Sequence, residues 1–235
     1  MTTSGTTTFN LDLNNLVEEA FERCGAELRT GYDMRTARRS LNLLTIEWAN
    51  KGINLWTIEQ GSIAMVQGTT TYNLPVDTID LLDHVIRTGT GSNQTDINIT
   101  RISVDTYATI PNKLTQGRPI QVWINRQSGA TEPTGINYPT INVWPAPDQS
   151  NYYTFVYWRL RRLQDAGNGI TTPDIPFRML PAMVAGLAYY LSIKLPDALP
   201  RVPMLKAMYD ESWQLAADED REKASLRLAP RQMFF

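Results

Sequence analysis

The spacing of apolar residues changes twice along this chain. Near the N-terminus the apolar positions follow the period of an α-helix, at Leu13, Leu16, Val17, Ala20, Phe21 and Cys24. After Gly52 the period becomes that of β-strands, and helical spacing returns only near Phe177. This pattern predicts an α+β fold in which a β domain is inserted into an α-helical body.

Two helices are predicted before the β region. Asn10 or Asp12 caps the first, which runs to about Arg29, and Asp33 caps the second, which ends at Gly52. We expect the two helices to pack as an antiparallel hairpin. Four charged residues on their polar faces are interpreted either as solvated charge or as a contact with a neighbouring subunit: Arg35, Arg38, Arg39 and Glu47.

Two more helices are predicted after the β region, which gives a helical bundle body of four. The third helix starts near Pro176 or Pro181 and ends at Pro196, because proline suits a helix start and cannot continue a helix. Pro203 opens the fourth helix. The mixed-sign charges at 218–223 are interpreted as a solvated helix face.

The middle of the chain predicts about seven short strands separated by Gly, Asn and Pro. Such strands favour an inserted antiparallel β-sandwich or small barrel. The long polar turns at 88–96 and 127–139 are expected to project from it. The predicted strands lie at 63–66, 70–74, 84–87, 97–99, 120–124, 140–144 and 153–158.

These patterns predict four parts of the chain. They are a flexible N-terminal arm at 1–9, a helical body at 10–54 and 176–223, an inserted β domain at 55–175, and an extended C-terminal tail at 224–235. The tail has no acidic residue and ends on two phenylalanines. Because exposed apolar residues are costly, the tail is expected either to fold back on its own domain or to insert into another protein. The candidate partner-binding residues are Leu226, Arg227, Leu228, Arg231, Met233, Phe234 and Phe235.

Charge and composition favour a folded protein without a general nucleic-acid surface. The formal net charge of −2 gives no basic footprint of the kind that phosphate binding requires. The apolar runs are short and the N-terminal segment is uncharged and Thr-rich, so we expect neither a membrane span nor a signal peptide. The single cysteine, Cys24, is predicted to be a buried small hydrophobic residue.

The sequence contains no recognisable catalytic constellation. Its one histidine, His84, has no cysteine or second histidine nearby with which to share a metal and is interpreted as a satisfied structural residue. No Gly-x-Ser-x-Gly elbow and no phosphate-binding glycine loop is present. Paired carboxylates leave a glycoside hydrolase open as an enzyme alternative. We predict no enzyme and no catalytic, cofactor-binding or metal-binding residues.

Several short segments carry a resemblance to a known family. The segment at 71–77 has the pattern Tyr-x-Leu-Pro-x-Asp, and six further segments lie at 16–21, 37–44, 48–53, 117–119, 143–147 and 185–190. Taken in this order, they resemble head-to-tail adaptor (connector) proteins of short-tailed bacteriophages. Each segment alone is short and non-catalytic.

The resemblance implies a structural virion protein at the head-tail junction, assembled in the host cytoplasm. Such adaptors form a homo-oligomeric ring, commonly twelvefold, that docks beneath the portal protein and forms part of the DNA ejection channel. The helical bodies would form the ring wall, and the β domains would face the tail nozzle or other tail proteins. The C-terminal tail would reach into the portal, and genomic DNA would pass through the lumen without sequence-specific binding.

Two other functions stay open at this point. A carbohydrate-binding or peptidoglycan-degrading tail-associated module would use aromatic residues of the β region to stack on sugar rings. A free-standing nucleic-acid binder is disfavoured by the net charge. The aromatic candidates are Trp123, Trp144, Tyr153 and Trp158, which are also the residues expected in a sheet core.

Overall fold

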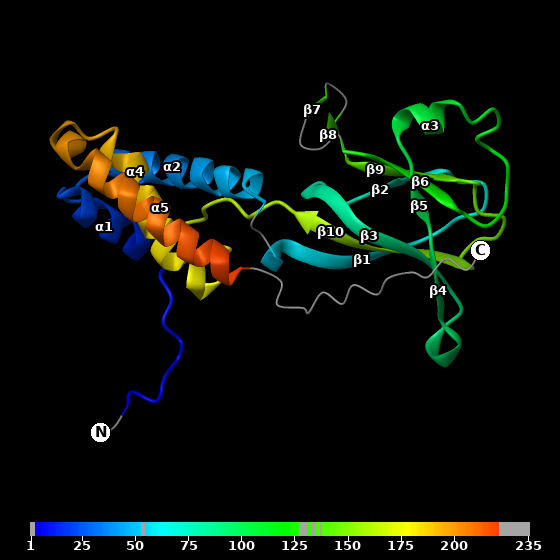
Figure 1. Ribbon diagram of the computed structural model, residues 1–235, viewed down its shortest axis with the longest axis horizontal. Coiled ribbons are helices and arrows are strands. Elements are labelled where there is room, and N and C mark those ends of the chain that lie inside the picture. The colour runs from blue at the N-terminus through cyan, green and yellow to red at the C-terminus, as the bar shows by residue number, and fades with distance from the viewer. Residues whose placement is uncertain (1–2, 53–54, 127–130, 133–134, 137, 221–235) are drawn as a thin grey trace, which may run out of the picture. The chain divides into compact units, whose positions relative to one another are not determined.

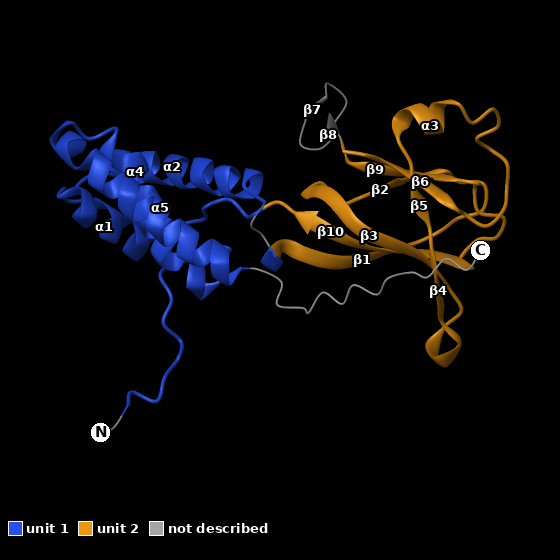
Figure 2. Cartoon of the chain, in the orientation of Figure 1, with its two compact units in different colours: residues 1–56, 163–235 blue, residues 57–162 orange. Residues whose placement is uncertain are grey.

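The computed structural model describes residues 3–52, 55–126, 131–132, 135–136 and 138–220. The chain divides into two compact units, one formed by residues 1–56 together with 163–235 and the other by residues 57–162 (Figures 1 and 2). The described residues form five α-helices and two four-stranded sheets. The predicted mixed α+β class is therefore confirmed.

Helix α1 (Leu13–Cys24) begins as predicted at Asp12, whose carboxylate accepts a hydrogen bond of 2.8 Å from the backbone N–H of Asn15. Its predicted end near Arg29 is wrong. Gly25 takes a left-handed conformation with φ of 75° and ends the helix, and glycine adopts this conformation without steric cost.

Helix α2 (Gly31–Asn50) starts earlier than predicted. Its N-cap is Thr30, whose hydroxyl accepts from the backbone N–H of Asp33, while the Asp33 carboxylate accepts from the backbone N–H of Thr30. Asp33 therefore lies inside the helix as the third residue of a capping box and is not the cap itself.

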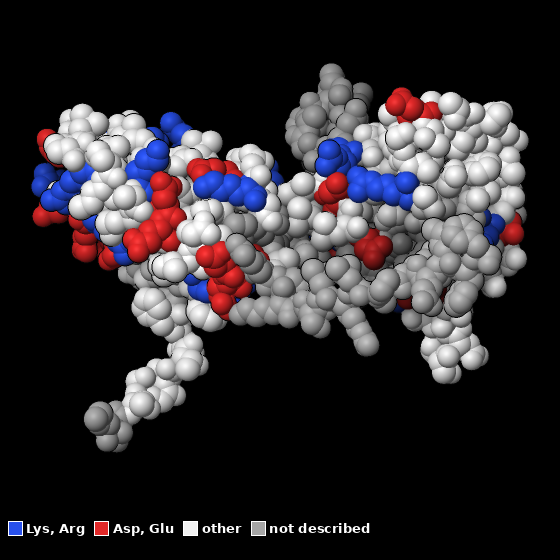
Figure 3. All heavy atoms as spheres, in the orientation of Figure 1, with Lys and Arg blue, Asp and Glu red and all other residues white. Residues whose placement is uncertain are grey.

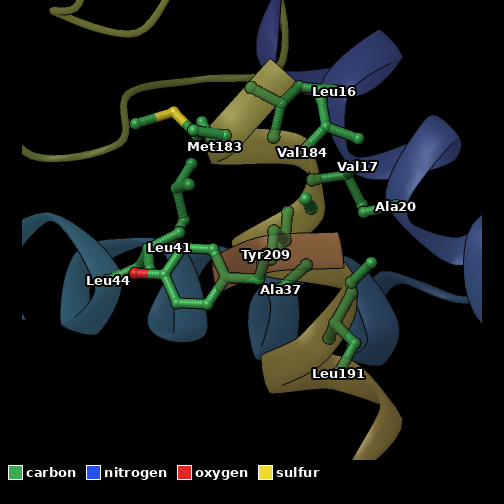
Figure 4. Packing of buried hydrophobic residues seen from close by; sticks show 14 of the residues in the cluster. Leu16, Val17, Ala20, Ala37, Leu41, Leu44, Met183, Val184, Leu191 and Tyr209 are labelled. Atoms are coloured by element: carbon green, nitrogen blue, oxygen red, sulfur yellow. The ribbon is translucent and has the colours of Figure 1, made fainter. Parts of the chain in front are cut away.

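Helices α4 (Leu180–Ser192) and α5 (Val202–Glu219) follow the two predicted C-terminal segments, with Pro181 and Pro203 in their first turns. Helix α4 is the most buried element of the first unit, and α1, α2 and α5 pack around it (Figure 4). Gly186 permits the close approach, since a Cβ at this position would lie 2.9 Å from side-chain carbons of both Leu44 and Tyr209.

The second unit contains the strands. One sheet has the order β1-β10-β3-β4 and the other the order β2-β9-β6-β5. In the first sheet the strands are β1 (Ile58–Ala64), β10 (Tyr153–Arg161), β3 (Thr78–Thr88) and β4 (Thr95–Asn98). In the second they are β2 (Thr71–Asn73), β9 (Thr140–Trp144), β6 (Gln121–Asn125) and β5 (Thr100–Arg101).

Four short elements of this unit were not predicted. They are helix α3 (Val104–Ala108), strand β5, and the two-residue strands β7 (Thr131–Glu132) and β8 (Gly135–Ile136) within the long polar turn. Segments of two to five residues are too short to show a period of hydrophobicity.

The predicted barrel-like closure is wrong, because the described strands form separate sheets. The predicted antiparallel arrangement is also incomplete, since β5 pairs with β6 in parallel. One apolar cluster draws side chains from both sheets, including Ile86 and Phe155 from the first and Val122 and Ile141 from the second.

Candidate interaction surfaces

The seven residues predicted to bind a partner, Leu226 to Phe235, lie outside the described residues, as does the whole predicted tail at 224–235. The other candidate interaction surfaces are formed by the described residues within 3–220. Three of them belong to the helical unit, and each is built from the outer faces of the helices.

One concave surface is a groove of about 640 Å³ along α1. Its floor is apolar and comes from Leu180 and Val184 of α4, and Phe9 and Leu11 of the N-terminal arm line it as well. Phe9 is 78% exposed. Three carboxylates of α1 line the same groove, namely those of Glu18, Glu19 and Glu22.

The sequence of α1 explains this acidic rim. Leu13, Leu16, Val17 and Ala20 turn toward the core, so the opposite face of the helix carries the glutamates. The backbone N–H of Leu13, one of the groups that a helix start leaves unpaired, donates a hydrogen bond of 3.0 Å to the carbonyl of Thr171.

The charges of the groove are only partly compensated. Glu19 forms an ion pair of 2.9 Å with Arg23 one turn later. Glu18 and Glu22 form no ion pair with any residue that the structure describes. The groove therefore combines an apolar floor with uncompensated negative charge.

A second surface is the outer face of α2, opposite the side that packs on α4. It carries large apolar side chains beside two arginines, Arg35 and Arg39, that have no ion pair within the described part of the chain. The exposed fractions are 68% for Tyr32, 50% for Leu43 and 44% for Ile46. Large exposed apolar residues that follow one helix face mark a contact surface for a protein partner.

The other two charged residues predicted on these helices are not free. Arg38 donates a hydrogen bond of 3.4 Å to the carbonyl of Ala166. Glu47 is a correction to the predicted solvated charge, because it lies half-buried between α2, α4 and α5 and accepts hydrogen bonds from Tyr190 at 2.5 Å and Tyr209 at 3.2 Å.

The third surface is a smaller hollow of about 440 Å³ around Glu47. Lys51 pairs with the Glu47 carboxylate at 2.7 Å, and its ammonium lies 4.5 Å from the ring centre of Trp213. Burial opposes ionisation of Glu47, but the hydrogen bonds from Lys51 and Tyr190 hold its pKa below the ordinary value. Burial and the same carboxylate raise the pKa of Tyr190. The cluster fixes the three helices to one another.

Asp220 is the residue that the sequence analysis missed most clearly. It was grouped with the solvated charges at 218–223, yet only 6% of it is exposed. Its carboxylate pairs with Arg178 and accepts a hydrogen bond from the backbone N–H of Leu55. Asp220 therefore joins the end of α5 to Arg178, just before α4, and to the backbone at Leu55.

In the β unit, Asp77 ends the segment with the Tyr-x-Leu-Pro-x-Asp pattern. Arg159 lies between the carboxylates of Asp77, at 2.5 Å, and Glu59, at 2.7 Å. Burial opposes ionisation of Asp77, but the Arg159 guanidinium holds its pKa below the ordinary value. Asp77 thus ties the start of β3 to Arg159 of β10 and has a structural role.

Cys24 and His84 are both buried in the structure. Cys24 is 2% exposed, as predicted, and burial raises its pKa to about 11. His84 is also buried and stacks on Phe155. His84 is therefore a buried structural residue, as predicted, and the hydrogen bonding of its ring stays a prediction.

The aromatic residues proposed for sugar stacking do not form an open platform. Tyr153 belongs to the core cluster, and Trp123 is half-buried and stacks on Tyr107 with ring centres 5.4 Å apart. The indole N–H of Trp144 donates to the carbonyl of Asn112. Nothing in this arrangement favours a carbohydrate site.

The described residues offer neither a metal cluster nor a membrane-spanning helix. The described residues contain no group of three or more His, Cys, Asp or Glu placed to hold a metal ion. None of the described helices is both long and apolar enough to cross a membrane. On the face shown in Figure 3, basic and acidic side chains lie intermixed over the helical unit.

These surfaces are those of a structural interaction protein, because the helices present apolar and charged faces suited to other proteins. The model of the SU10 adaptor protein family matches residues 12–231, and the chain belongs to that family. A search of curated proteins gives no match. The resemblance to head-to-tail adaptors is thus confirmed. The protein is a bacteriophage structural adaptor, a virion component that contacts other head or tail proteins.

Proposed function

We propose that this protein forms the head-to-tail adaptor ring that joins the portal to the tail and lines part of the DNA ejection channel. The observation that carries the proposal is the family match, because it covers residues 12–231 and thus both compact units. A protein of this kind acts by assembly and has no substrate, so a non-enzymatic role follows from the proposal.

In this proposal the helical unit forms the ring wall and the β unit contacts the tail nozzle or another tail protein. The helices act as a bundle around α4, and the two four-stranded sheets act as a sandwich around their shared apolar core. Support for the sandwich comes from the core cluster, which contains side chains of both sheets. A ring of about twelve copies would multiply modest contacts into a stable junction.

The C-terminal tail at 224–235 is proposed to insert into the portal. Its apolar residues and its arginines suit a groove on a partner, and the segment has no acidic residue. The binding residues in this proposal are Leu226, Arg227, Leu228, Arg231, Met233, Phe234 and Phe235.

The lumen of the ring would let genomic DNA pass without sequence-specific binding. A net charge of −2 supports a surface that does not retain phosphate groups. Assembly would take place in the host cytoplasm, and the finished ring would lie at the head-tail junction of the virion.

The direct test is association with the portal of the same phage. Purified full-length chain and purified portal are mixed and separated by size-exclusion chromatography with light scattering. We expect a single complex whose mass corresponds to one portal plus a ring of about twelve chains. Separate elution of the two proteins at micromolar concentration would contradict the proposal.

A further inference from the structure

We propose that the subunits of the ring contact one another through two surfaces of the helical unit, with the outer face of α2 of one copy seated in the acidic groove of the next copy. This inference rests on the proposed ring and adds the residues that build it. The occupant of the groove is thus a second copy of this chain.

The two surfaces carry complementary charges. Glu18 and Glu22 line the groove, and Arg35 and Arg39 stand on the outer face of α2. All four side chains lack an ion pair among residues that the structure describes. Each surface therefore offers charge that nothing in its own described chain neutralises.

The charged residues of the two surfaces have the same spacing along their helices. The two glutamates are four residues apart on α1, and the two arginines are four residues apart on α2. Residues at this spacing lie on one helix face with their Cβ atoms about 6 Å apart. When the two helices lie side by side, both ion pairs can therefore form at the same time.

Both surfaces also contain apolar residues. The groove exposes Phe9 above a floor that includes Leu180 and Val184. On α2, Leu43 and Ile46 continue the arginine face toward the C-terminus with 50% and 44% exposure. Because one surface is concave and the other is the convex side of a helix, joining them removes apolar area from water on both.

The groove and the α2 face lie on different sides of the helical unit. Val184 of α4 points to Leu16 and Val17 of α1 (Figure 4), whereas Gly186 is packed against Leu44 of α2. The Gly186 position lies equally close to Tyr209 of α5. Residues two apart in a helix point about 200° away from each other, so α1 packs on a different side of α4 from α2 and α5. The outer faces of α1 and α2 are therefore distinct surfaces of one subunit. Contacts between unlike faces of a subunit are heterologous and generate rings when the rotation closes.

The test uses two charge-reversed forms of the full chain. One carries Glu18→Arg with Glu22→Arg in the groove, and the other carries Arg35→Glu with Arg39→Glu on α2. Self-association is followed by sedimentation velocity, alone and with portal, and circular dichroism checks the fold. Each form alone should need at least about a tenfold higher concentration to associate, because every contact juxtaposes like charges.

A mixture of the two forms provides the decisive result. In the mixture the reversed groove accepts the reversed α2 face, and the wild-type groove accepts the wild-type α2 face, so rings of alternating copies should form again. The matched control is Asp210→Arg with Glu211→Arg, two exposed acidic residues of α5 outside the groove, which should associate as the wild type does.

The possible failures are distinguishable. If either reversed form still assembles as the wild type does, the inference is wrong and the proposed ring stands. If groove reversal blocks only portal binding, or if the mixture fails to assemble while both forms stay folded, the groove holds the tail or the portal and the inference is again wrong. If the wild type forms no ring with or without portal, the proposed function fails together with it.

Discussion

His84 is a buried base, and burial lowers its pKa below the ordinary value of 6.5. The nearby Asp83 carboxylate and a backbone hydrogen bond with Ile99 oppose this shift, and Arg101 adds to it. A lowered pKa means that the unfolded state binds the proton more tightly, so the stability contributed by neutral His84 is present above about pH 6.5 and is lost as the pH falls through the folded-state pKa.

We therefore predict that the free energy of unfolding falls between about pH 7 and pH 5 and that His84→Phe reduces this dependence. Phenylalanine keeps the stacking on Phe155 and cannot take up a proton. Urea denaturation at several pH values measures the effect for both proteins. An unchanged slope in the variant would show that other groups cause it.

Asp220 is predicted to stabilise the helical unit through its ion pair with Arg178. Asp220→Ala leaves a guanidinium that is one third exposed without its partner, so we expect a loss of about 2 kcal/mol, less than for a fully buried pair. Chemical denaturation gives the value. Asp210→Ala, which removes an exposed carboxylate from the same helix, should change the stability by less than about 0.5 kcal/mol.

Sequence reasoning succeeded for Cys24 and failed for Asp220 and Glu47, for one physical reason. Burial of Cys24 follows from its place on the apolar side of α1, which is a local pattern. The partners of the two carboxylates come from other elements, because Arg178 lies 42 residues from Asp220 and Tyr190 lies 143 residues from Glu47. No local pattern reports such contacts.

At the scale of elements, the packing of α4 depends on a residue without a side chain. Gly186→Leu is predicted to lower the free energy of unfolding by about 2 kcal/mol, since the new side chain would displace Leu44 and Tyr209. In an exposed helix the same change would be favourable by about 1 kcal/mol. Thermal or chemical unfolding decides between the two.

The matched control is Gly31, also a helical glycine, where an added Cβ would meet nothing within 4 Å. Gly31→Ala should therefore leave the stability unchanged or raise it slightly. Equal effects of substitution at the two glycines would contradict the packing of α2 and α5 on α4.

The helices were easier to predict than the sheets. Hydrophobic period and capping residues act within one helix, so α1, α2, α4 and α5 were found with errors at their ends. Strand pairing depends on distant segments. The first strand of the β unit, β1, pairs with the last, β10. The separate sheets and the parallel β5–β6 pair consequently could not be read from alternation alone.

At the scale of the whole molecule, the acidic groove was also beyond sequence reasoning. Its walls come from residues 9–23 and 180–184, and only the fold brings these segments together. The tail at 224–235 was singled out by composition, and its role in binding stays a prediction.

Removal of residues 224–235 is predicted to reduce portal binding by at least about tenfold and to leave the thermal unfolding of the helical unit unchanged, because the proposed binding residues lie in the segment removed. Surface plasmon resonance with immobilised portal measures the first effect, and calorimetry measures the second. The control replaces Arg227 and Arg231 with lysine, which keeps the charge. Undiminished binding by the truncated chain would remove the tail from the portal contact.

The central claim is that this chain works as a ring between the portal and the tail. Electron microscopy of the full-length protein mixed with portal tests it most directly. The account predicts a closed ring of adaptor density, coaxial with the portal and with an open central channel. Portal particles without added density, or single adaptor copies bound at scattered positions, would contradict it.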